Sequence, residues 1–431
     1  MTNKLYDTIF DPFSPNRDTG NNDSFSYHIF ENIRVNCSFH VPSVVQNVIT
    51  NSSDKFNVLH INARSIVNKM DDLNQLLVDT GVVWQIISIS ETWLPKSLEN
   101  HYKMPGYRSF FCERSVGVGG GSGLYIAENL CPENLQCPSF TSAEVICTSI
   151  KLNNHNLVIC QIYRSPNSNK YKFIDELEQC LIWLNKLNKT IVMTGDFNFD
   201  LLSIETSAPA QLFFSTLLSH GLFPTISRTT RSSSSSSTLI DNIFCNDLSK
   251  VAHSGIILND ISDHFPIFAS LSINVNSNDN ILNKSNKTLT FDYKRIDEFN
   301  QFLSEKLQTI ENETCPEFIA NKIIATYNEG MAQFSYMKTN SRRNNPRHPW
   351  MSPAILQSTV HKNDLFQEKL KNPSPSNVLK YNRYRNTLTR VIRLAKRKYY
   401  LQEFEKHSGN SKETWKTLQT LIKSKQGAGH Y

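Results

Sequence analysis

The chain has 431 residues, of which 39% are hydrophobic and 10% aromatic, so a wholly disordered protein is excluded and two or three structural units are expected. Its nine cysteines form no CxxC pair. This argues against a disulfide framework or a zinc site and favours an intracellular, reducing compartment, either nuclear or cytoplasmic. No apolar run reaches the about 18 residues of a membrane span, so no membrane partner is expected.

The formal net charge of +6 is divided unevenly along the chain. Residues 281–431 contain 26 Lys and Arg against 13 Asp and Glu, a balance of +13, whereas residues 1–280 contain 19 against 26, a balance of −7. Such asymmetry is typical of a basic segment that meets a polyanion, so nucleic acid is the expected partner. The alternative is a lysine-rich helical surface that only faces solvent.

The N-terminal part of the sequence changes character near residue 55. Residues 1–54 are rich in Asn, Ser and Asp and predict a loosely ordered leader. Short β-branched runs between turn signals then predict strands at 56–62, 82–90, 122–127, 144–152, 156–163, 190–195, 238–244 and 264–273. Apolar residues at helical spacing predict helices over 66–80, 170–189 and 208–220. Together they predict an α/β domain over 55–273, with two packed sheets and helices outside.

The C-terminal part is predicted to be helical and basic. Residues 274–289 are polar and predict a linker to a helical region over 290–431, in which the clearest helix covers 377–407. Its expected DNA-binding cations are Arg383, Arg385, Lys396, Arg397 and Lys398. The tyrosines 381, 384, 399 and 400 interleave with them, either to stack on bases or to fill an amphipathic core.

The strongest chemical signal is Gly195-Asp196-Phe197-Asn198 at the end of an apolar strand. Asp196 and Asn198 are two residues apart on an extended segment, so their side chains point the same way. A carboxylate there can hold a water or a metal while the amide contacts a phosphate oxygen. The alternative is an ordinary turn, because Gly, Asp and Asn favour turns.

Other polar residues stand at or beside predicted strand ends. Asp263 and His264 precede the strand FPIFASL, and histidine is the side chain best suited to proton movement near neutral pH. Asp241 lies among apolar neighbours and needs a partner, for which His264 is suitable. Asn62, Glu91, Tyr163 and Arg164 end three further strands. Each has a plain structural alternative, such as a turn Asn, a solvated Glu, a core Tyr or an edge-strand Asp.

Taken together, these residue types suit phosphodiester hydrolysis with one metal ion. A metal neutralises phosphate charge and polarises the leaving oxygen, while a carboxylate or a His–Asp pair activates water. Mg²⁺ takes few protein carboxylates and keeps its waters, so Glu91 and one Asp would suffice. Mn²⁺ is the alternative ion, and no small-molecule cofactor is expected.

The order of the motifs LHINARSI, ISETWL, RSVGVGGGSGLYI, IYRSP, TGDFN, LIDNIF and SDHFPI resembles the endonuclease/exonuclease/phosphatase superfamily. Within it, the chain is most similar to the apurinic-type endonuclease domain of non-LTR retrotransposons of the LINE and jockey-like type. The resemblance covers about 56–273. It implies a four-layered α/β sandwich, Mg²⁺ dependence, and nicking of DNA to leave a 3′ hydroxyl that primes reverse transcription.

The resemblance also implies a role for each candidate residue. Glu91 would be the metal carboxylate, with Asn62 and Asp263 near the metal, and Asn198 would bind phosphate or a metal water. Asp196 would position or deprotonate the attacking water, Tyr163 would contact phosphate, and Asp241 would orient His264. Arg164 and Thr225 are the remaining candidate DNA contacts of this domain. The basic tail resembles the segment that joins endonuclease to reverse transcriptase, and element RNA is a second expected partner there.

Two departures from the wider superfamily narrow the function. The apurinic repair enzymes carry an Asp two residues after the first-strand Asn, where this chain has Arg64. That difference argues against abasic-site repair and predicts weak Mg²⁺ binding before DNA arrives. The inositol phosphatases have Trp-Cys-Asp-Arg where this chain has Leu239-Ile240-Asp241-Asn242, which weakens a phosphatase assignment.

Three hypotheses therefore remain. The first is an active DNA nickase, since no expected catalytic residue has been lost. The second is a nucleic-acid-binding relic without catalysis. The third is a phosphoesterase of the same fold, which would have no use for a basic tail. The paired aspartates of a polymerase, in a YxDD text, are absent from the sequence, so the chain is expected to be a truncated element.

Overall fold

The computed structural model describes residues 37–49, 55–67, 69–112, 119–152, 155–232, 236–273, 287–291, 295–308, 316–339 and 349–423. Two compact units are present, residues 1–277 with 347–431 and residues 278–346. The predicted leader up to residue 36 and most of the predicted linker, 274–286, lie outside the described residues. Among the described helices, none combines the length and the hydropathy that a membrane span requires.

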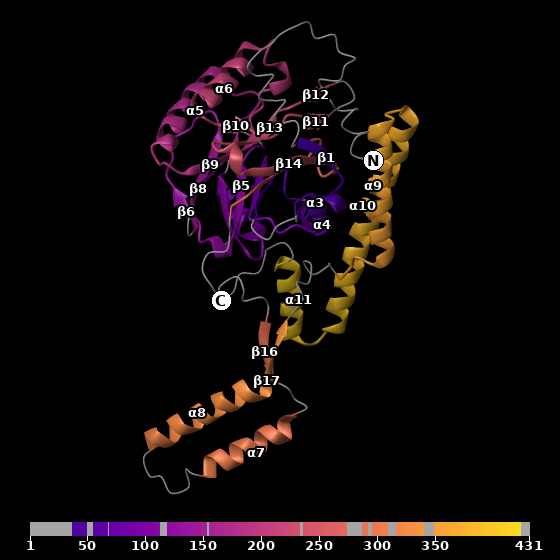
Figure 1. The fold of residues 1–431 in the computed structure, drawn as a ribbon. Coiled ribbons are helices and arrows are strands. Elements are labelled where there is room, and N and C mark those ends of the chain that lie inside the picture. Colours follow the sequence, from indigo (N-terminus) through magenta and orange to yellow (C-terminus); the bar gives the residue numbers. More distant parts are fainter. Residues whose placement is uncertain are drawn as a thin grey trace. The chain divides into compact units, whose positions relative to one another are not determined.

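Two sheets form the centre of the larger unit (Figure 1). The first has seven strands, in the order β1 (Cys37–His40), β14 (Val251–Ile257), β15 (Ile267–Leu271), β2 (Phe56–Asn62), β3 (Ile86–Ser90), β5 (Ser122–Ala127) and β4 (Tyr107–Cys112). The second has six, in the order β10 (Phe223–Pro224), β13 (Asp241–Cys245), β9 (Thr190–Asp196), β8 (His155–Tyr163), β7 (Glu144–Leu152) and β6 (Glu133–Leu135). A two-stranded sheet joins β11 (Arg231–Ser232) to β12 (Ser237–Thr238).

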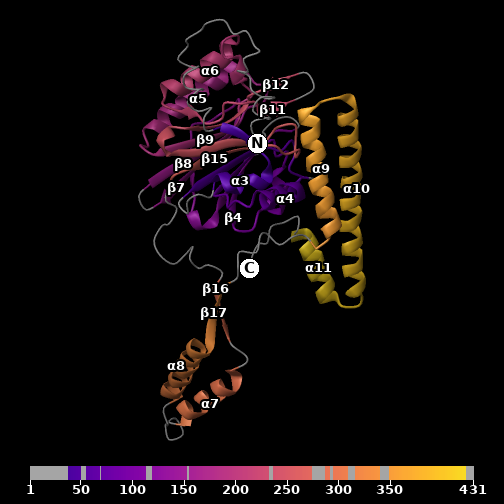
Figure 2. The ribbon, with the colours of Figure 1, turned by 45° about the vertical axis from the view of Figure 1, so that its right-hand side comes forward.

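Helices cover the outer faces of both sheets. The first sheet carries α3 (Pro42–Ile49) and α4 (Met70–Thr80), and the second carries α5 (Lys170–Asn185) and α6 (Ala208–Ser219) (Figure 2). One apolar cluster fills the space between the sheets and under α5 and α6, and a second lies beneath α3 and α4. The predicted α/β sandwich of four layers is therefore confirmed.

The strand β2 shows how the sequence positions a polar site inside this sandwich. All seven of its residues are buried, because both faces of the sheet are covered. Leu59 and Ile61 belong to the cluster under α3 and α4, whereas Val58 belongs to the cluster between the sheets. His60 and Asn62 continue the Val58 face, since side chains alternate along a strand. The interior face is thus apolar where β2 begins and polar where it ends.

Several predicted boundaries need correction. Residues 37–49 were assigned to a loose leader, but β1 pairs in parallel with β14 and α3 packs on the first sheet. The predicted helix over 66–80 begins only at Met70, because Arg64 and Ser65 adopt positive φ and the chain turns before it. The predicted strand 238–244 is divided between β12 and β13, and residues 287–289 of the predicted linker belong to a strand.

The predicted helical region over 290–431 also divides. Its second part consists of α9 (Pro353–Lys371), α10 (Pro375–Lys406) and α11 (Ser411–Lys423), and belongs to the larger unit. Leu365, Phe366 and Tyr381 join the apolar cluster between the sheets. The α9–α10 hairpin is therefore docked on the sandwich by side-chain burial.

The smaller unit contains the first part of that region. Its strands β16 (Lys287–Phe291) and β17 (Ser335–Thr339) pair antiparallel, and α7 (Ile296–Leu307) and α8 (Pro316–Phe334) lie between them in sequence. Phe299 packs edge-on against Tyr327 and Phe334, which joins the two helices.

Candidate active site

Three buried titratable side chains meet where β9 and β13 adjoin each other. Asp196 and Asp241 are direct partners in the antiparallel register of these strands. His264 Nδ1 lies 2.8 Å from Asp241 Oδ2. Each of the three side chains is at most 2% exposed. One ligand atom from each lies within 4.8 Å of the others, so this group has the geometry to hold a metal ion.

The charges of this group shift its pKa values in opposite directions. Burial, reinforced by the charge of Asp241, raises the pKa of Asp196 to about 7. Burial alone would lower the pKa of His264, but the charge and hydrogen bond of Asp241 outweigh it and raise this pKa to about 9. In turn, His264 holds the pKa of Asp241 below its usual range despite its burial. Near neutral pH, Asp241 and His264 therefore form an ion pair beside a carboxyl group that is poised to titrate.

Asn62 connects two of the predicted acids. Its Nδ2 donates to Glu91 Oε1 at 2.9 Å and to Asp196 Oδ2 at 2.7 Å. Its Oδ1 accepts from the backbone N–H of Arg64 at 3.1 Å. In this structure Asn62 therefore connects both carboxylates, and its predicted place near the metal stays a prediction.

A buried polar chain supports the site from within the sandwich, and sequence reasoning missed it. His60 lies on the other side of Asp241 from His264, with its Nε2 3.6 Å from Asp241 Oδ1. His60 Nδ1 is 2.9 Å from Ser88 Oγ, which donates to Gln161 Oε1. Gln161 Nε2 donates to Ser90 Oγ, which accepts from the backbone N–H of Asp196.

The alternation of side chains along the strands contained a signal for this row of buried polar residues. His60 precedes Asn62 by two residues on β2, as Ser88 precedes Ser90 on β3 and Gln161 precedes Tyr163 on β8. Residues two apart share a face, so the predicted residues Asn62 and Tyr163 each have a polar neighbour one step deeper on the same face of the strand. Thr230 was also missed, although its Oγ1 donates to Asp241 Oδ2 at 2.7 Å.

A cleft of about 260 Å³, here called the catalytic cleft, opens above this group. Its lining includes the predicted residues Glu91, Tyr163, Asn198 and His264 together with Arg64, Trp93, Gly119, Gly120 and Arg231. Gly119 and Gly120 belong to the motif RSVGVGGGSGLYI, of which Gly117 and Val118 lie outside the described residues. Gly119 lies so close to Trp93 that an added Cβ would be 3.2 Å from Trp93 Nε1.

Backbone strain gathers around this cleft. Seven described residues other than glycine have positive φ, and five of them are Arg64, Ser65, Glu91, Trp93 and Asn198. Such conformations cost about 1–3 kcal/mol each and persist only where surrounding structure imposes them. Trp93 Nε1 donates to Glu91 Oε2 at 3.2 Å, and Asn198 Nδ2 donates to the carbonyl of Arg164 at 2.8 Å. These bonds fix the loops that follow β3 and β9.

The donors around the cleft suit a hard divalent cation. Glu91 is half-buried at the cleft and offers a carboxylate. Asp263 Oδ2 is shared by Arg64 Nη1 at 3.1 Å and Arg231 Nη2 at 2.9 Å. Its Oδ1 is buried and has no hydrogen-bond partner among the described residues, an arrangement that a cation would satisfy. Asp241 Oδ1 is likewise buried without a hydrogen-bond partner among the described residues, but it faces His60 Nε2 at 3.6 Å, and His264 and Thr230 occupy its Oδ2.

Two predicted DNA contacts are contradicted by their positions. Arg164 is fully buried and its guanidinium donates to the carbonyls of Phe197 and Asn198 at 2.7 and 2.9 Å. It also stacks on Phe199, 4.5 Å from the ring centroid. Thr225 is 1% exposed and its Oγ1 donates to the carbonyl of Ile243. Both hold the fold together, since neither presents a free polar group to a ligand.

The five predicted cations of the C-terminal helix lie on α10 and differ in surroundings. Arg383, Arg385, Arg397 and Lys398 are exposed. Lys396 instead pairs with Asp71 at 2.6 Å and lies over the ring of Trp350, so it helps to dock the helix. Tyr381 and Tyr400 are buried against protein, which favours the core alternative for these two tyrosines.

Residues 56–264 match the model of the endonuclease/exonuclease/phosphatase family. No curated protein matches the chain. The endonuclease domain of TRAS1, a telomere-specific non-LTR retrotransposon, is 14% identical, with a TM-score of 0.41 over 50% of this chain and 98% of that one.

Two further solved structures show the same level of likeness. The catalytic domain of Xenopus laevis APE2 is 18% identical, with a TM-score of 0.42 over 52% of this chain and 94% of that one. An AP endonuclease from Archaeoglobus fulgidus is 16% identical, with a TM-score of 0.39 over 51% of this chain and 100% of that one.

Proposed function

We propose that the protein, whose residues 56–264 match the model of the endonuclease/exonuclease/phosphatase family, is a Mg²⁺-dependent DNA endonuclease that nicks its target and leaves a 3′ hydroxyl. The observation that carries this proposal is the buried Asp196–Asp241–His264 group beneath a cleft lined by Glu91. It combines a carboxyl group that titrates near neutral pH with a charged imidazole at one wall of the same cleft.

Asp196 is the proposed general base. A base is most effective when its pKa lies near the working pH, and burial raises the pKa of Asp196 to about 7. Its Oδ2 accepts from Asn62 and its Oδ1 accepts from the N–H of Asn198, so the carboxyl group is held rigidly. Asp196 takes a proton from water as the water oxygen bonds to phosphorus and the bond from phosphorus to O3′ breaks, and the leaving O3′ takes up a proton from solvent to become the 3′ hydroxyl.

His264 is the proposed cationic partner of the phosphate. Asp241 fixes its ring through Nδ1, which leaves Nε2 for a ligand in the cleft. A protonated imidazole there stabilises negative charge that grows on the phosphoryl oxygens. Tyr163 and Asn198 line the same cleft and are the proposed further donors to phosphate.

Glu91 and Asp263 are the proposed holders of the divalent ion. When bound, such an ion neutralises phosphate charge and polarises the leaving oxygen. Asp241 and His264 are less suited to hold it, because the charged imidazole repels a second cation. The two arginines on Asp263 also weaken binding of a free ion, so Mg²⁺ is expected to bind tightly only together with DNA.

The biological role is proposed to be that of a retrotransposon-derived nickase, whose 3′ end primes reverse transcription. Support comes from the motif order and from Arg64, which replaces the acid of the repair enzymes. The basic α9–α10 hairpin further favours a long polyanion over the small phosphate esters that a phosphoesterase would take.

The test is nicking of supercoiled plasmid by the full chain, with Mg²⁺ and with EDTA, followed by polymerase extension from the nick. We expect Mg²⁺-dependent nicks that a polymerase extends, and none from Asp196→Asn. The matched control is Asp175→Asn, which changes an exposed carboxylate on α5 and should nick like the parent chain. A folded parent chain that binds DNA but never nicks it would contradict the proposal and favour the relic.

A further inference from the structure

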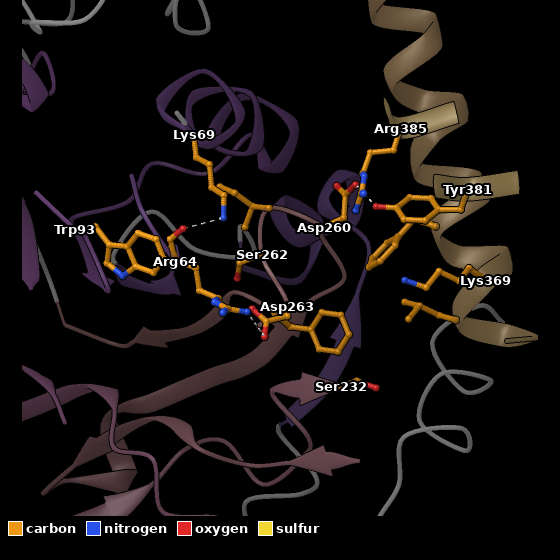
Figure 3. Close-up of a pocket in the computed structure, with 14 residues that line it drawn as sticks. Arg64, Lys69, Trp93, Ser232, Asp260, Ser262, Asp263, Lys369, Tyr381 and Arg385 are labelled. Atoms are coloured by element: carbon orange, nitrogen blue, oxygen red, sulfur yellow. Dashed lines mark hydrogen bonds and ion pairs between the residues drawn. The ribbon is translucent and has the colours of Figure 1, made fainter. Parts of the chain in front are cut away.

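A second cleft, here called the basic cleft, lies between the sandwich and the α9–α10 hairpin. Its volume is about 540 Å³. Four cations line it, and Figure 3 shows them around the opening, with Arg64 and Lys69 on the sandwich, Lys369 on α9 and Arg385 on α10. The family match ends at residue 264, so the last two residues lie on helices outside the matched domain.

The helical wall of the basic cleft is fixed by contacts with the segment that leads to His264. Asp260 Oδ1 accepts from Lys362 Nζ at 2.7 Å, and its Oδ2 accepts from the hydroxyl of Tyr381 at 2.5 Å. Asp260 is itself only 8% exposed. Phe366 and Tyr381 pack beside this bond, with ring centroids 5.4 Å apart. The cleft is therefore a built feature of the larger unit.

The basic cleft has more cations than its carboxylates can neutralise. Its two acids already have cationic partners, since Asp260 pairs with Lys362 and Asp263 pairs with Arg64 and Arg231. By contrast, Lys69, Lys369 and Arg385 form no ion pair with any carboxylate in the part of the chain that the structure describes.

The position of the helical cations adds to this imbalance. Lys369 Nζ lies 4.9 Å and the Arg385 guanidinium 5.6 Å from the centroid of the same Tyr381 ring. Two cations on one ring repel each other, and a shared anion would offset that repulsion.

The basic cleft adjoins the catalytic cleft, because Arg64 and Trp93 line both. A strand with its scissile phosphate near His264 would therefore carry its neighbouring phosphates past Arg64. Arginine and lysine side chains are the common protein contacts to nucleic-acid phosphates. Trp93 lies where the two clefts adjoin and is 42% exposed as a residue, so a base could stack on it.

We propose that the basic cleft binds a backbone phosphate of the DNA strand that is cleaved, with Lys369 and Arg385 as its helical ligands. The α9–α10 hairpin is thereby part of the substrate-binding surface. This inference rests on the proposed function for the identity of the polyanion, although its test requires no cleavage.

The experiment compares two double variants of the full chain. Lys369→Ala with Arg385→Ala removes the two helical cations of the basic cleft. Arg390→Ala with Arg393→Ala removes the same charge from exposed positions on α10 that do not line either cleft. Binding of a fluorescent DNA duplex is followed by anisotropy in EDTA over a series of salt concentrations. Thermal melting of each variant verifies that it is folded.

We expect the cleft variant to bind more weakly, and the slope of log K against log salt to become shallower by about 0.9 for each phosphate that the protein no longer neutralises. The exposed pair should change the slope less. Duplexes with one methylphosphonate at each position in turn then locate the phosphate that the cleft binds. The parent chain should lose affinity at a defined position, and the cleft variant should be insensitive there. Equal effects of the two double variants would overturn the proposal.

The outcomes separate this inference from the proposed function. If the parent chain loses DNA affinity at a defined methylphosphonate position but does not nick plasmid, the basic cleft is supported as a DNA-binding site and the proposed nuclease function is contradicted. If the parent chain nicks plasmid and the cleft variant binds DNA as tightly as the parent, the nuclease function is supported. The proposed phosphate-binding role of the basic cleft is then contradicted.

Discussion

Replacement of Asp241 by Asn tests how charge is distributed at the centre of the site. Asp241 raises the pKa of His264 to about 9 against the opposing effect of burial. Asparagine has the same shape and can still accept from Thr230, but it carries no charge. Burial, which lowers the pKa of His264, would then be opposed only by the charges of Asp196 and Asp263, so this pKa should fall from about 9. The ring should therefore lose its proton at a lower pH than in the parent chain.

The same change has a predictable effect on stability. The pKa of His264 is higher in the folded chain, about 9, than in the unfolded chain, about 6.5, so the imidazolium stabilises the fold fully below pH 6.5. That stabilisation is lost as the pH rises through about 9, and it corresponds to about 3 kcal/mol. The difference in unfolding free energy between the parent chain and Asp241→Asn should shrink by about that amount between pH 6.5 and pH 9.

The assay is an NMR titration of ¹³C-labelled histidine in metal-free protein, with His264→Gln to assign the resonance. Urea unfolding at the two pH values measures the stability difference. Asp175→Asn is the control, because it removes an exposed carboxylate and should leave both quantities unchanged. A His264 resonance that still titrates near pH 9 in Asp241→Asn would refute the ion pair as the cause.

Three further predictions concern single residues. Asp196→Asn should lower kcat for nicking by about 10²–10⁴-fold and leave DNA affinity unchanged. Plasmid nicking measures the first and fluorescence anisotropy the second. A smaller loss of kcat would contradict Asp196 as the general base. Arg164→Met should cost about 2–4 kcal/mol in urea unfolding, because buried carbonyls lose their donor; weakened DNA binding at unchanged stability would restore its predicted contact role. Gly195→Ala should cost about 3 kcal/mol or more, since its Cβ would lie 1.8 Å from the carbonyl oxygen of Ile162. Gly221→Ala, which has open space, should cost only about 1 kcal/mol from its positive φ.

The pH dependence of nicking gives a fourth prediction. Asp196 acts as a base only when ionised, and His264 acts as a cation only when protonated. The rate should therefore rise as the pH passes about 7 and fall as it passes about 9. Asp241→Asn should move the alkaline limb to lower pH. A profile that is flat between about pH 6 and pH 10 would contradict both assignments.

The sequence by itself determined the fold class and most of the strands. β2, β5 and β7 lie at the predicted residues, because short β-branched runs between turn signals depend on local preference. It also identified Asp196, Asp241 and His264, since each is a titratable group at or next to an apolar strand. Local pattern is sufficient for such residues because an isolated charge in an apolar segment is costly.

Only the tertiary structure decided which polar residues meet at the candidate site and which hold the fold. Arg164 and Thr225 stand in segments as polar as those of the candidate site residues, yet packing turns their side chains inward. His60 and Gln161 reach the site only because two sheets face each other, a pairing between strands far apart in sequence. The basic cleft likewise requires α9 and α10 to meet a loop about 100 positions earlier, at Asp260. Sequence periodicity reports which face of an element is buried, but it contains no information on what that face is buried against.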